Sequence, residues 1–547
     1  MLRSNFVFEL SRRGDTGIRE ASLGACLAIV ANLSAAPAMM RRYTKSILSF
    51  TKGVFMHHRL EGLVKELREM GLLVGVGSLL SWDQETYMPP GAIGVRSEQS
   101  AILASLVHEM MTGDRFSGIL SELIESNTDD FSDTEKRLLT EVHRDWKRAI
   151  CLPTSFVSEY SQLVSHAQHI WQEAREKSDF GLFEPFLEKL VEKSREKAAY
   201  IDANKAAYDV LLDTYEPGMT TAYLTPLFAT LREGLVDILN RIKPSELSLS
   251  DRVFPVEKQW EYGVWFLTQM GFDFSRGRQD KSTHPFTTQF HPHDVRITTR
   301  LDANHVMDGF SSTVHEGGHA LYEQGLDPAW FGTPLGEAMS LGIHESQSRM
   351  WENQIAKSAS FWKGQYGRFQ ALFPDALSDI NSETFYKTVN RVKPSLIRVD
   401  ADEVTYNLHI LIRYELEIAL MDGSLKVSDL PAAWNKKYED YLGICPPDAS
   451  QGVLQDVHWS CGLFGYFPTY TLGNLYAAQF FEKMKVDILD LDGCISRADF
   501  APITAWLRKN IHGVGRGKTP QELVKDVTGK SLSQEAFIRY LLGKYLG

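Results

Sequence analysis

Apolar residues at intervals of three and four recur along most of this chain, and this helical spacing limits what the chain can fold into. Between His57 and Leu80 the spacing is followed by Leu60, Leu63, Val64, Leu67, Met70 and Leu73. Apolar residues spaced in this way lie on one face of an α-helix. The helix is expected to continue through Glu85 and to end at the Pro-Pro-Gly sequence of residues 89–91, because proline and glycine interrupt helices.

The same helical pattern returns at residues 132–150, 183–199 and 223–242. The first of these segments opens with Ser132, and Glu135 follows three residues later, a pair that is typical of a capping box. Hydrophobic residues make up 43% of the 547 residues, and no internal repeat or low-complexity linker divides the chain. We therefore predict a mainly α-helical fold in which residues 56–547 form a single catalytic domain.

One segment departs from the helical pattern. Residues 284–301 read HPFTTQFHPHDVRITTRL, in which Thr, Phe, Val and Ile alternate with polar residues. Alternation with a period of two is typical of β-strands. A small β-sheet is therefore expected immediately before residues 314–321, which carry the strongest chemical motif of the chain.

That motif is His-Glu-x-x-His, at residues 315–319 of the sequence VHEGGHAL. Residues four apart lie on the same face of a helix, so His315 and His319 can bind one cation. Zinc accepts imidazole and carboxylate ligands and leaves a fourth position for water. Glu316 is then placed to take a proton from that water and to pass it to a leaving amine.

The alternative interpretation of this motif is a surface helix with two solvated histidines. In a chain with 16 histidines, chance would produce only about 0.03 such matches. The flanking residues are apolar or small, as in a buried helix. Gly317 and Gly318 each cost about 1 kcal/mol relative to alanine in a helix interior, so they indicate a close approach by a neighbouring helix or by substrate. These features favour a metal site.

A third metal ligand must come from a neighbouring element. Glu345 follows His319 at a distance that leaves room for a loop and a returning helix, and it would complete a site of two histidines and one glutamate. Glu337 and Glu352 are the alternatives, although the first precedes the helix and the second lies two turns beyond Glu345. His344 is expected to support the metal site or to contact substrate, and a purely structural hydrogen bond is its alternative.

Further motifs follow in order along the chain. They are HPF at 284–286, DVRIT at 294–298, HESQ at 344–347, IRVDAD at 397–402 and GVLQDVHW at 452–459. Together with the metal motif, they resemble the signatures of the carboxypeptidase Taq family of metallocarboxypeptidases. Residues 82–90, 512–513 and 520–523 look like the terminal regions of that family, so the resemblance covers residues 56–547.

The resemblance implies a mostly helical fold with a deep active-site groove, a small β-sheet beside the metal helix, and a homodimer. It implies the release of single amino acids from peptide C-termini, with broad specificity and poor cleavage next to proline. One divalent ion per subunit, zinc or alternatively cobalt, is implied at His315, His319 and Glu345, with Glu316 as the general base.

The resemblance also suggests which arginine holds the substrate. Arg398 is the first candidate for binding the C-terminal carboxylate, because a guanidinium can donate two parallel hydrogen bonds to a carboxylate. Its alternative role is an ion pair with Asp400 or Asp402. Arg296 is a second candidate for the same carboxylate.

Three further residues are expected near the substrate. His458 and Tyr470 are placed to donate hydrogen bonds to the tetrahedral oxyanion or to the peptide backbone, with ordinary core packing as the alternative. His284 is expected to line the site from the β-sheet. Two other functions stay open: a helical metallo-oligopeptidase that cuts internal bonds, and a non-enzymatic helical scaffold.

Residues 1–55 differ in composition from the rest of the chain. They carry eight basic and three acidic residues, whereas the whole chain has a net charge of −12. Residues 21–40 are apolar but too interrupted for a convincing transmembrane helix. We expect an N-terminal extension that is a disordered tail, an over-extended start or an organelle-targeting segment. The acidic body argues against binding to nucleic acid or membranes, and five scattered cysteines favour an intracellular, cytoplasmic protein.

Two other patterns are not expected to carry function. Cys461 follows a histidine and a tryptophan but lacks the surroundings of a thiol-protease nucleophile. The glycine-rich residues 513–519 resemble a phosphate-binding loop, but His512 stands where such a loop needs its first glycine. A helix rather than a strand is expected before that segment, so nucleotide binding is disfavoured.

Overall fold

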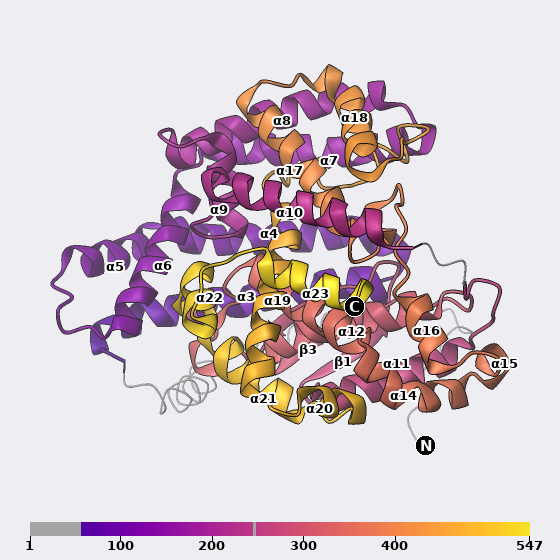
Figure 1. Ribbon diagram of the computed structural model, residues 1–547. Coiled ribbons are helices and arrows are strands. Elements are labelled where there is room, and N and C mark those ends of the chain that lie inside the picture. Colours follow the sequence, from indigo (N-terminus) through magenta and orange to yellow (C-terminus); the bar gives the residue numbers. More distant parts are fainter. Residues whose placement is uncertain (1–55, 244–247) are drawn as a thin grey trace, which may run out of the picture. The chain divides into compact units, whose positions relative to one another are not determined.

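The structure is a computed structural model that describes residues 56–243 and 248–547 (Figure 1). Within this part of the chain, His57–Gly547 form one compact unit. The predicted mainly α-helical fold is confirmed, since helices make up most of the unit and the described residues contain one three-stranded sheet. The N-terminal extension predicted for residues 1–55 lies outside the described residues.

A first series of helices precedes the sheet. It comprises α3 (Glu61–Thr86), α4 (Ile93–Thr112), α5 (Asp114–Glu125), α6 (Asp133–Ile150), α7 (Thr154–Lys177), α8 (Phe180–Asp202), α9 (Ala207–Tyr215), α10 (Thr221–Arg241) and α11 (Val256–Met270). The four helices that the sequence predicted are found as α3, α6, α8 and α10. The expected capping box forms at α6, where Ser132 and Glu135 each bind the other's backbone N–H.

The sheet has the strand order β1–β3–β2. β2 (Thr287–His291) and β3 (Asp294–Thr299) are antiparallel, so the small sheet expected from residues 284–301 is found. β1 (Gly277–Lys281) pairs in parallel with β3. Its sequence GRQDK has no alternating apolar residues, which is why the sequence did not predict it. Val295 and Ile297 of β3 are buried and join the sheet to the core.

A second series of helices follows the sheet. It comprises α12 (Val306–Gly325), α13 (Leu341–Arg349), the π-helix η5 (Met350–Ala356), α14 (Ala359–Leu372), α15 (Pro374–Leu377), α16 (Ser382–Val389), α17 (Thr405–Asp422), α18 (Leu430–Leu442), α19 (Pro468–Asp487), α20 (Leu491–Arg497), α21 (Ala501–Asn510), α22 (Pro520–Thr528) and α23 (Glu535–Tyr545). Short 3₁₀ turns are η1 (His58–Leu60), η2 (Pro90–Ala92), η3 (Pro328–Trp330), η4 (Pro334–Gly336), η6 (Arg398–Asp400), η7 (Val427–Asp429) and η8 (His512–Gly517). Since α21 precedes η8 and α22 follows it, no strand leads into the glycine-rich segment.

Helix α12, which carries the metal motif, packs against β3, α11 and α13. A Cβ atom at Gly317 would lie 2.5 Å from Leu267 Cδ2 of α11, and one at Gly318 would lie 2.7 Å from Ser348 Cα of α13. At Gly318 the neighbour is backbone, so a larger residue would force the helices apart, whereas at Gly317 it is the end of a flexible leucine side chain. The two glycines therefore allow neighbouring helices to approach closely, which is one of the two explanations that the sequence left open.

Among the described residues, no helix combines the length and the apolarity that crossing a bilayer requires. The apolar residues 21–40 lie outside this search.

Candidate metal centre

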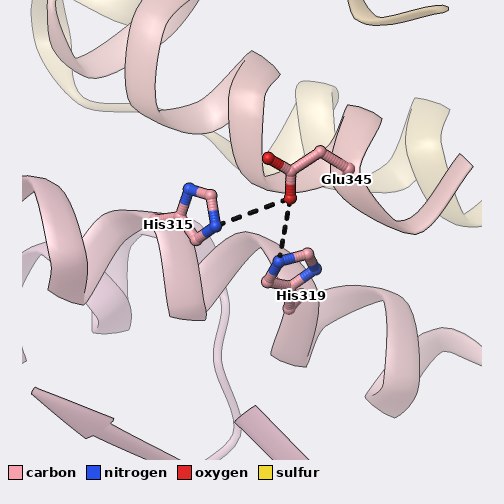
Figure 2. A group of neighbouring side chains, drawn as sticks. All are labelled: His315, His319 and Glu345. Carbon is pink, nitrogen blue, oxygen red and sulfur yellow. Dashed lines mark ion pairs between the residues drawn. The ribbon is translucent and has the colours of Figure 1, made fainter. Parts of the chain in front are cut away.

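Two helices bring three potential metal ligands together (Figure 2). His315 and His319 lie one turn apart on α12, and Glu345 faces them from α13. Glu345 Oε2 lies 3.6 Å from His315 Nε2 and 3.4 Å from His319 Nε2. One ligand atom from each residue lies within 4.8 Å of the other two. The structure thus brings together the three residues predicted as ligands.

These separations fit a shared metal ion better than direct ion pairs. Two ligands held about 2.0–2.1 Å from a tetrahedral zinc ion are about 3.3 Å apart, close to both measured distances. A direct hydrogen bond between imidazole and carboxylate would be shorter, at about 2.7–2.9 Å. Two imidazoles and one carboxylate also form a donor set that zinc accepts. The residues present therefore fit a divalent metal ion.

The outer nitrogen of each histidine is held by a hydrogen-bond partner. His315 Nδ1 lies 3.0 Å from Glu352 Oε2. His319 Nδ1 lies 2.5 Å from His344 Nδ1, and His344 Nε2 lies 2.6 Å from Glu323 Oε1. With the protons on the outer nitrogens, both Nε2 lone pairs face the ligand position. Such partners fix the ring orientation and tautomer of a metal-binding histidine.

Burial and neighbouring charges act differently on the two imidazoles. Burial, together with nearby His344, lowers the pKa of His319 to about 3. His319 is therefore neutral at physiological pH, as a metal ligand must be. Burial also opposes protonation of His315, but Glu345 and Glu352 outweigh it and raise the pKa of His315.

The structure distinguishes between the three carboxylates that were considered as the third metal ligand. Glu345 faces the Nε2 atoms of both histidines, whereas Glu352 contacts only the outer nitrogen of His315. Glu337 is exposed and accepts a hydrogen bond of 3.0 Å from Arg516. Glu345 is therefore the carboxylate that the geometry favours.

Glu345 is itself held in place on α13. Arg349 Nε donates to its Oε1 at 2.7 Å, and the Ser348 hydroxyl donates to its Oε2 at 3.1 Å. Burial disfavours ionisation of Glu345, but Arg349 and the two ligand histidines outweigh burial and lower the pKa of this carboxyl. A permanently ionised Glu345 is suited to binding a cation.

Glu316 follows the first ligand on α12 and has a different environment. Its Oε2 accepts a hydrogen bond of 2.7 Å from the Thr287 hydroxyl of β2, and its carbonyl oxygen lies 2.9 Å from the same hydroxyl. Burial raises the pKa of Glu316. A carboxylate with a raised pKa accepts a proton more readily, which suits the predicted role as general base.

Arg398 lies in a buried polar cluster. Its Nε donates to Asp456 Oδ1 at 2.9 Å, its Nη2 lies 2.8 Å from the same oxygen as an ion pair, and its Nη1 donates to the Tyr406 hydroxyl at 3.0 Å. The alternative role of Arg398 as an ion-pair partner is thus seen, but the acidic partner is Asp456 rather than Asp400 or Asp402. Two of its five N–H donors form hydrogen bonds in this way.

The two predicted hydrogen-bond donors contact each other beside this cluster. His458 Nε2 lies 3.2 Å from the Tyr470 hydroxyl, and the Arg398 guanidinium lies 5.1 Å from the centre of the Tyr470 ring. Within the described residues, the Nδ1 atom of His458 has no hydrogen-bond partner. The structure therefore groups His458, Tyr470 and Arg398.

Arg296 and His284 lie elsewhere on the sheet. Arg296 forms an ion pair of 3.0 Å with Asp294, and its guanidinium lies 4.3 and 4.6 Å from the ring centres of Trp82 and Phe290. His284 is exposed in the loop between β1 and β2, where only its carbonyl oxygen forms a hydrogen bond among the described residues. The structure does not bring the His284 side chain into contact with the predicted ligands.

The sequence of the chain matches a known family across nearly all of the described unit. The family described as "Carboxypeptidase Taq (M32) metallopeptidase" matches residues 62–545. The chain belongs to this family. The resemblance noted from the ordered motifs is therefore confirmed. Membership in M32 implies a divalent metal, and His315, His319 and Glu345 form a group that could hold it.

Individual M32 relatives align over almost their whole length. "Thermostable carboxypeptidase 1" of Thermus thermophilus is 44% identical over 501 residues, which are 89% of this chain and 98% of that protein. "Carboxypeptidase 1" of Bacillus subtilis is 41% identical over 472 residues, 86% of this chain and 94% of its own length. The crystal structure of an M32 carboxypeptidase from Deinococcus radiodurans has a TM-score of 0.87 at 39% identity, covering 89% of this chain and 99% of that one.

Sequence reasoning missed several residues that hold this M32 site together. Arg349 binds Glu345, Thr287 binds Glu316, and Asp456 binds Arg398. Glu323 supports His319 through His344. Of these contacts, helix geometry could have indicated only the one between Glu345 and Arg349, because residues four apart lie on the same face of a helix.

Proposed function

We propose that this M32 metallocarboxypeptidase uses one zinc ion bound by His315, His319 and Glu345, with Glu316 as general base. The observation that carries the proposal is the convergence of two Nε2 atoms and one Oε2 atom at separations of 3.4 and 3.6 Å. Cobalt could replace zinc, because both ions accept this donor set. The alternatives of an internal-cutting oligopeptidase and a non-enzymatic scaffold are not favoured by the family match.

In the proposed mechanism, the bound ion supplies Lewis-acid polarisation of water and of the scissile carbonyl. Glu316 accepts the proton of the attacking water and transfers it to the leaving amine, which carries the released C-terminal residue. The hydroxyl of Thr287 keeps the Glu316 carboxylate in a fixed orientation during both transfers. His458 and Tyr470 donate hydrogen bonds to the oxyanion or to the substrate backbone.

Arg398 is the proposed anchor for the substrate's C-terminal carboxylate. Asp456 and Tyr406 accept hydrogen bonds from two of its donors, and the remaining N–H groups of Nη1 and Nη2 can bind a carboxylate. Arg296 is the second candidate. His284 and His344 are proposed to contact substrate, and His344 has the additional contact with His319.

The family resemblance extends the proposal to substrate and assembly. We expect broad specificity at peptide C-termini, with poor cleavage next to proline. We also expect a homodimer in the cytoplasm, unless residues 1–55 direct the chain to an organelle. Nucleic acid and membranes are not expected partners of this acidic protein.

The test uses one peptide in two forms, unblocked and amidated at its C-terminus, with products identified by mass spectrometry. We expect stepwise loss of single C-terminal residues from the unblocked peptide and little hydrolysis of the amidated one. Chelator should abolish the reaction, and added zinc should restore it. Internal cleavage of both peptides would contradict the exopeptidase assignment.

The choice of anchor is tested with Arg398→Ala and Arg296→Ala on the unblocked peptide. Loss of a charge-assisted carboxylate contact is expected to raise KM, or lower kcat/KM, by about 10–100-fold. We expect this effect for Arg398→Ala and a smaller one for Arg296→Ala. The reverse order would assign the anchor to Arg296.

A further inference from the structure

Glu216 is a buried carboxylate that the proposed mechanism does not use. It follows the last residue of α9, and its side chain has no exposed surface. Within the described residues, no lysine, arginine or histidine forms an ion pair with it. An unpaired carboxylate in a protein interior is strongly unfavourable unless hydrogen bonds compensate for lost hydration. Its position therefore needs a specific explanation.

The hydrogen bonds of Glu216 converge on the start of α13. Its Oε2 accepts from the backbone N–H of Gly342 at 3.0 Å. Ser340 is the N-cap of α13, and Gly342 lies in its first turn. Oε1 accepts from the Tyr476 hydroxyl of α19 at 2.7 Å. One carboxylate thus links α13 to α19.

The approach between Glu216 and α13 is unusually close. A Cβ atom at Gly342 would lie 2.5 Å from Glu216 Oε2, so the glycine leaves room for the carboxylate against the helix backbone. The N-terminus of a helix presents unpaired N–H groups and a partial positive charge. A carboxylate at this position therefore holds the helix start by both hydrogen bonds and electrostatics.

Helix α13 carries Glu345 one turn after Gly342 and is also held by His344, which contacts α12, and by Gln347, which contacts η8. Sideways movement is limited by Gly318 of α12, which approaches the backbone of Ser348, and by Gly473 of α19, where a Cβ would lie 2.5 Å from Glu345 Cγ. A slide of one residue, about 1.5 Å, would be enough to spoil the spacing of the three ligand atoms.

We infer that Glu216 is a positioning residue of the metal centre, which holds the start of α13 and thereby helps to set the distance of Glu345 from His315 and His319. This inference rests on the proposed function, because it requires that these three residues bind the ion. It assigns a role in metal affinity to a residue that does not touch the metal ligands.

Glu417 on α17 provides a matched control. It is also without exposed surface, and it accepts three hydrogen bonds, from the Tyr208 hydroxyl at 2.8 Å, Trp459 Nε1 at 2.9 Å and the Gly465 N–H at 3.1 Å. Burial raises the pKa of Glu216 and that of Glu417 to about 7. Glu417 makes no hydrogen bond to α12 or α13, so replacing it reports the general effect of losing a buried carboxylate.

The experiment measures the zinc dissociation constant by competition with a chromophoric chelator, for the full chain and for alanine and glutamine variants at both positions. We expect Glu216→Ala to weaken zinc binding about tenfold, the lower end of effects known for groups that orient metal ligands. Glu216→Gln, which keeps one acceptor oxygen, should fall between Glu216→Ala and the wild type. Glu417→Ala and Glu417→Gln should bind zinc as the wild type does.

Two results would overturn the inference: unchanged zinc affinity in the Glu216 variants, or an equal loss of affinity in the Glu417 variants. Should Glu216→Ala fail to fold, the comparison of Glu216→Gln with Glu417→Gln decides in the same way. A wild-type chain that binds no zinc would instead contradict the proposed function, and the inference with it.

Discussion

At the scale of single residues, two carboxylates in the same site have opposite pKa shifts. The pKa of Glu345 is lowered because Arg349 and the ligand histidines outweigh its burial, whereas burial raises the pKa of Glu316. Environment alone can thus give one carboxylate the role of permanent anion and another the role of proton acceptor. The proposed division of labour between ligand and base follows from this difference.

Replacing Glu316 with glutamine should separate chemistry from metal binding. Glu316 does not contact the ligand atoms, so Glu316→Gln should keep the wild-type zinc content. Its rate of peptide hydrolysis should fall at least about 10²–10⁴-fold, because the amide cannot accept the proton. Zinc content and kcat measured on the same preparation check this. A variant that keeps most of its activity would contradict the role of general base.

Replacing Glu352 should instead weaken metal binding more than it affects catalysis by the metal-loaded protein. Its carboxylate orients His315 through the outer ring nitrogen, and loss of such a partner typically weakens metal affinity about 10–100-fold. Glu352→Gln should therefore bind zinc more weakly, yet recover much of its activity at saturating zinc. Glu383→Gln, an exposed substitution on α16, is the control. If Glu352→Gln binds zinc as tightly as the control does, Glu352 does not hold His315 in its metal-binding orientation.

At the scale of helices, glycines decide how closely the ligand-bearing elements approach. A Cβ atom at Gly318 would lie 2.7 Å from Ser348 Cα and 2.8 Å from the Gln347 carbonyl oxygen. Gly318→Ala should therefore push α12 away from α13, reduce the free energy of unfolding by about 1–3 kcal/mol and weaken zinc binding.

The matched control for this prediction is Gly367→Ala. Gly367 lies in α14, is exposed and has no atom within 4 Å of its Cβ position. Alanine there should increase the free energy of unfolding by about 0.5–1 kcal/mol. Chemical denaturation and zinc titration of both variants give the comparison. Equal effects at the two positions would mean that the contact between α12 and α13 is not tight.

Some helices and strands could be predicted from the sequence, and others could not. Four-residue spacing predicted α12 and both of its histidines, and alternation predicted β2 and β3. The polar strand β1 and the contact between Glu352 and His315 were not predictable in this way. β1 has no apolar pattern, and the contact joins two helices through tertiary packing, which local periodicity does not encode. The same limit applies to Arg398. As an alternative to substrate binding, an ion pair with the nearby Asp400 or Asp402 was considered, but the partner is Asp456, which is distant in sequence.

At the scale of the whole molecule, buried glutamates make stability depend on pH. The pKa of Glu417 is raised by burial from its ordinary value of 4.5 to about 7. Because the folded pKa is above the unfolded one, the folded state binds more protons between these values. Stability from this group is present below pH 4.5 and is lost as pH rises towards 7.

Glu417→Gln removes this dependence, since glutamine does not ionise. Its free energy of unfolding relative to the wild type should therefore increase between pH 5 and pH 8, by about 2–3 kcal/mol. Urea unfolding of both proteins at the two pH values provides the measurement, with the exposed Glu188→Gln as control. A difference that stays constant with pH would contradict the raised pKa.

Two imidazoles on α12 and one carboxylate on α13 are proposed to hold a single metal ion together. Equilibrium dialysis of the wild type and of Glu345→Ala against zinc, followed by elemental analysis, tests it most directly. The structure predicts one zinc per chain in the wild type and a large loss of zinc in Glu345→Ala. Full zinc occupancy in Glu345→Ala would show that the third ligand lies elsewhere.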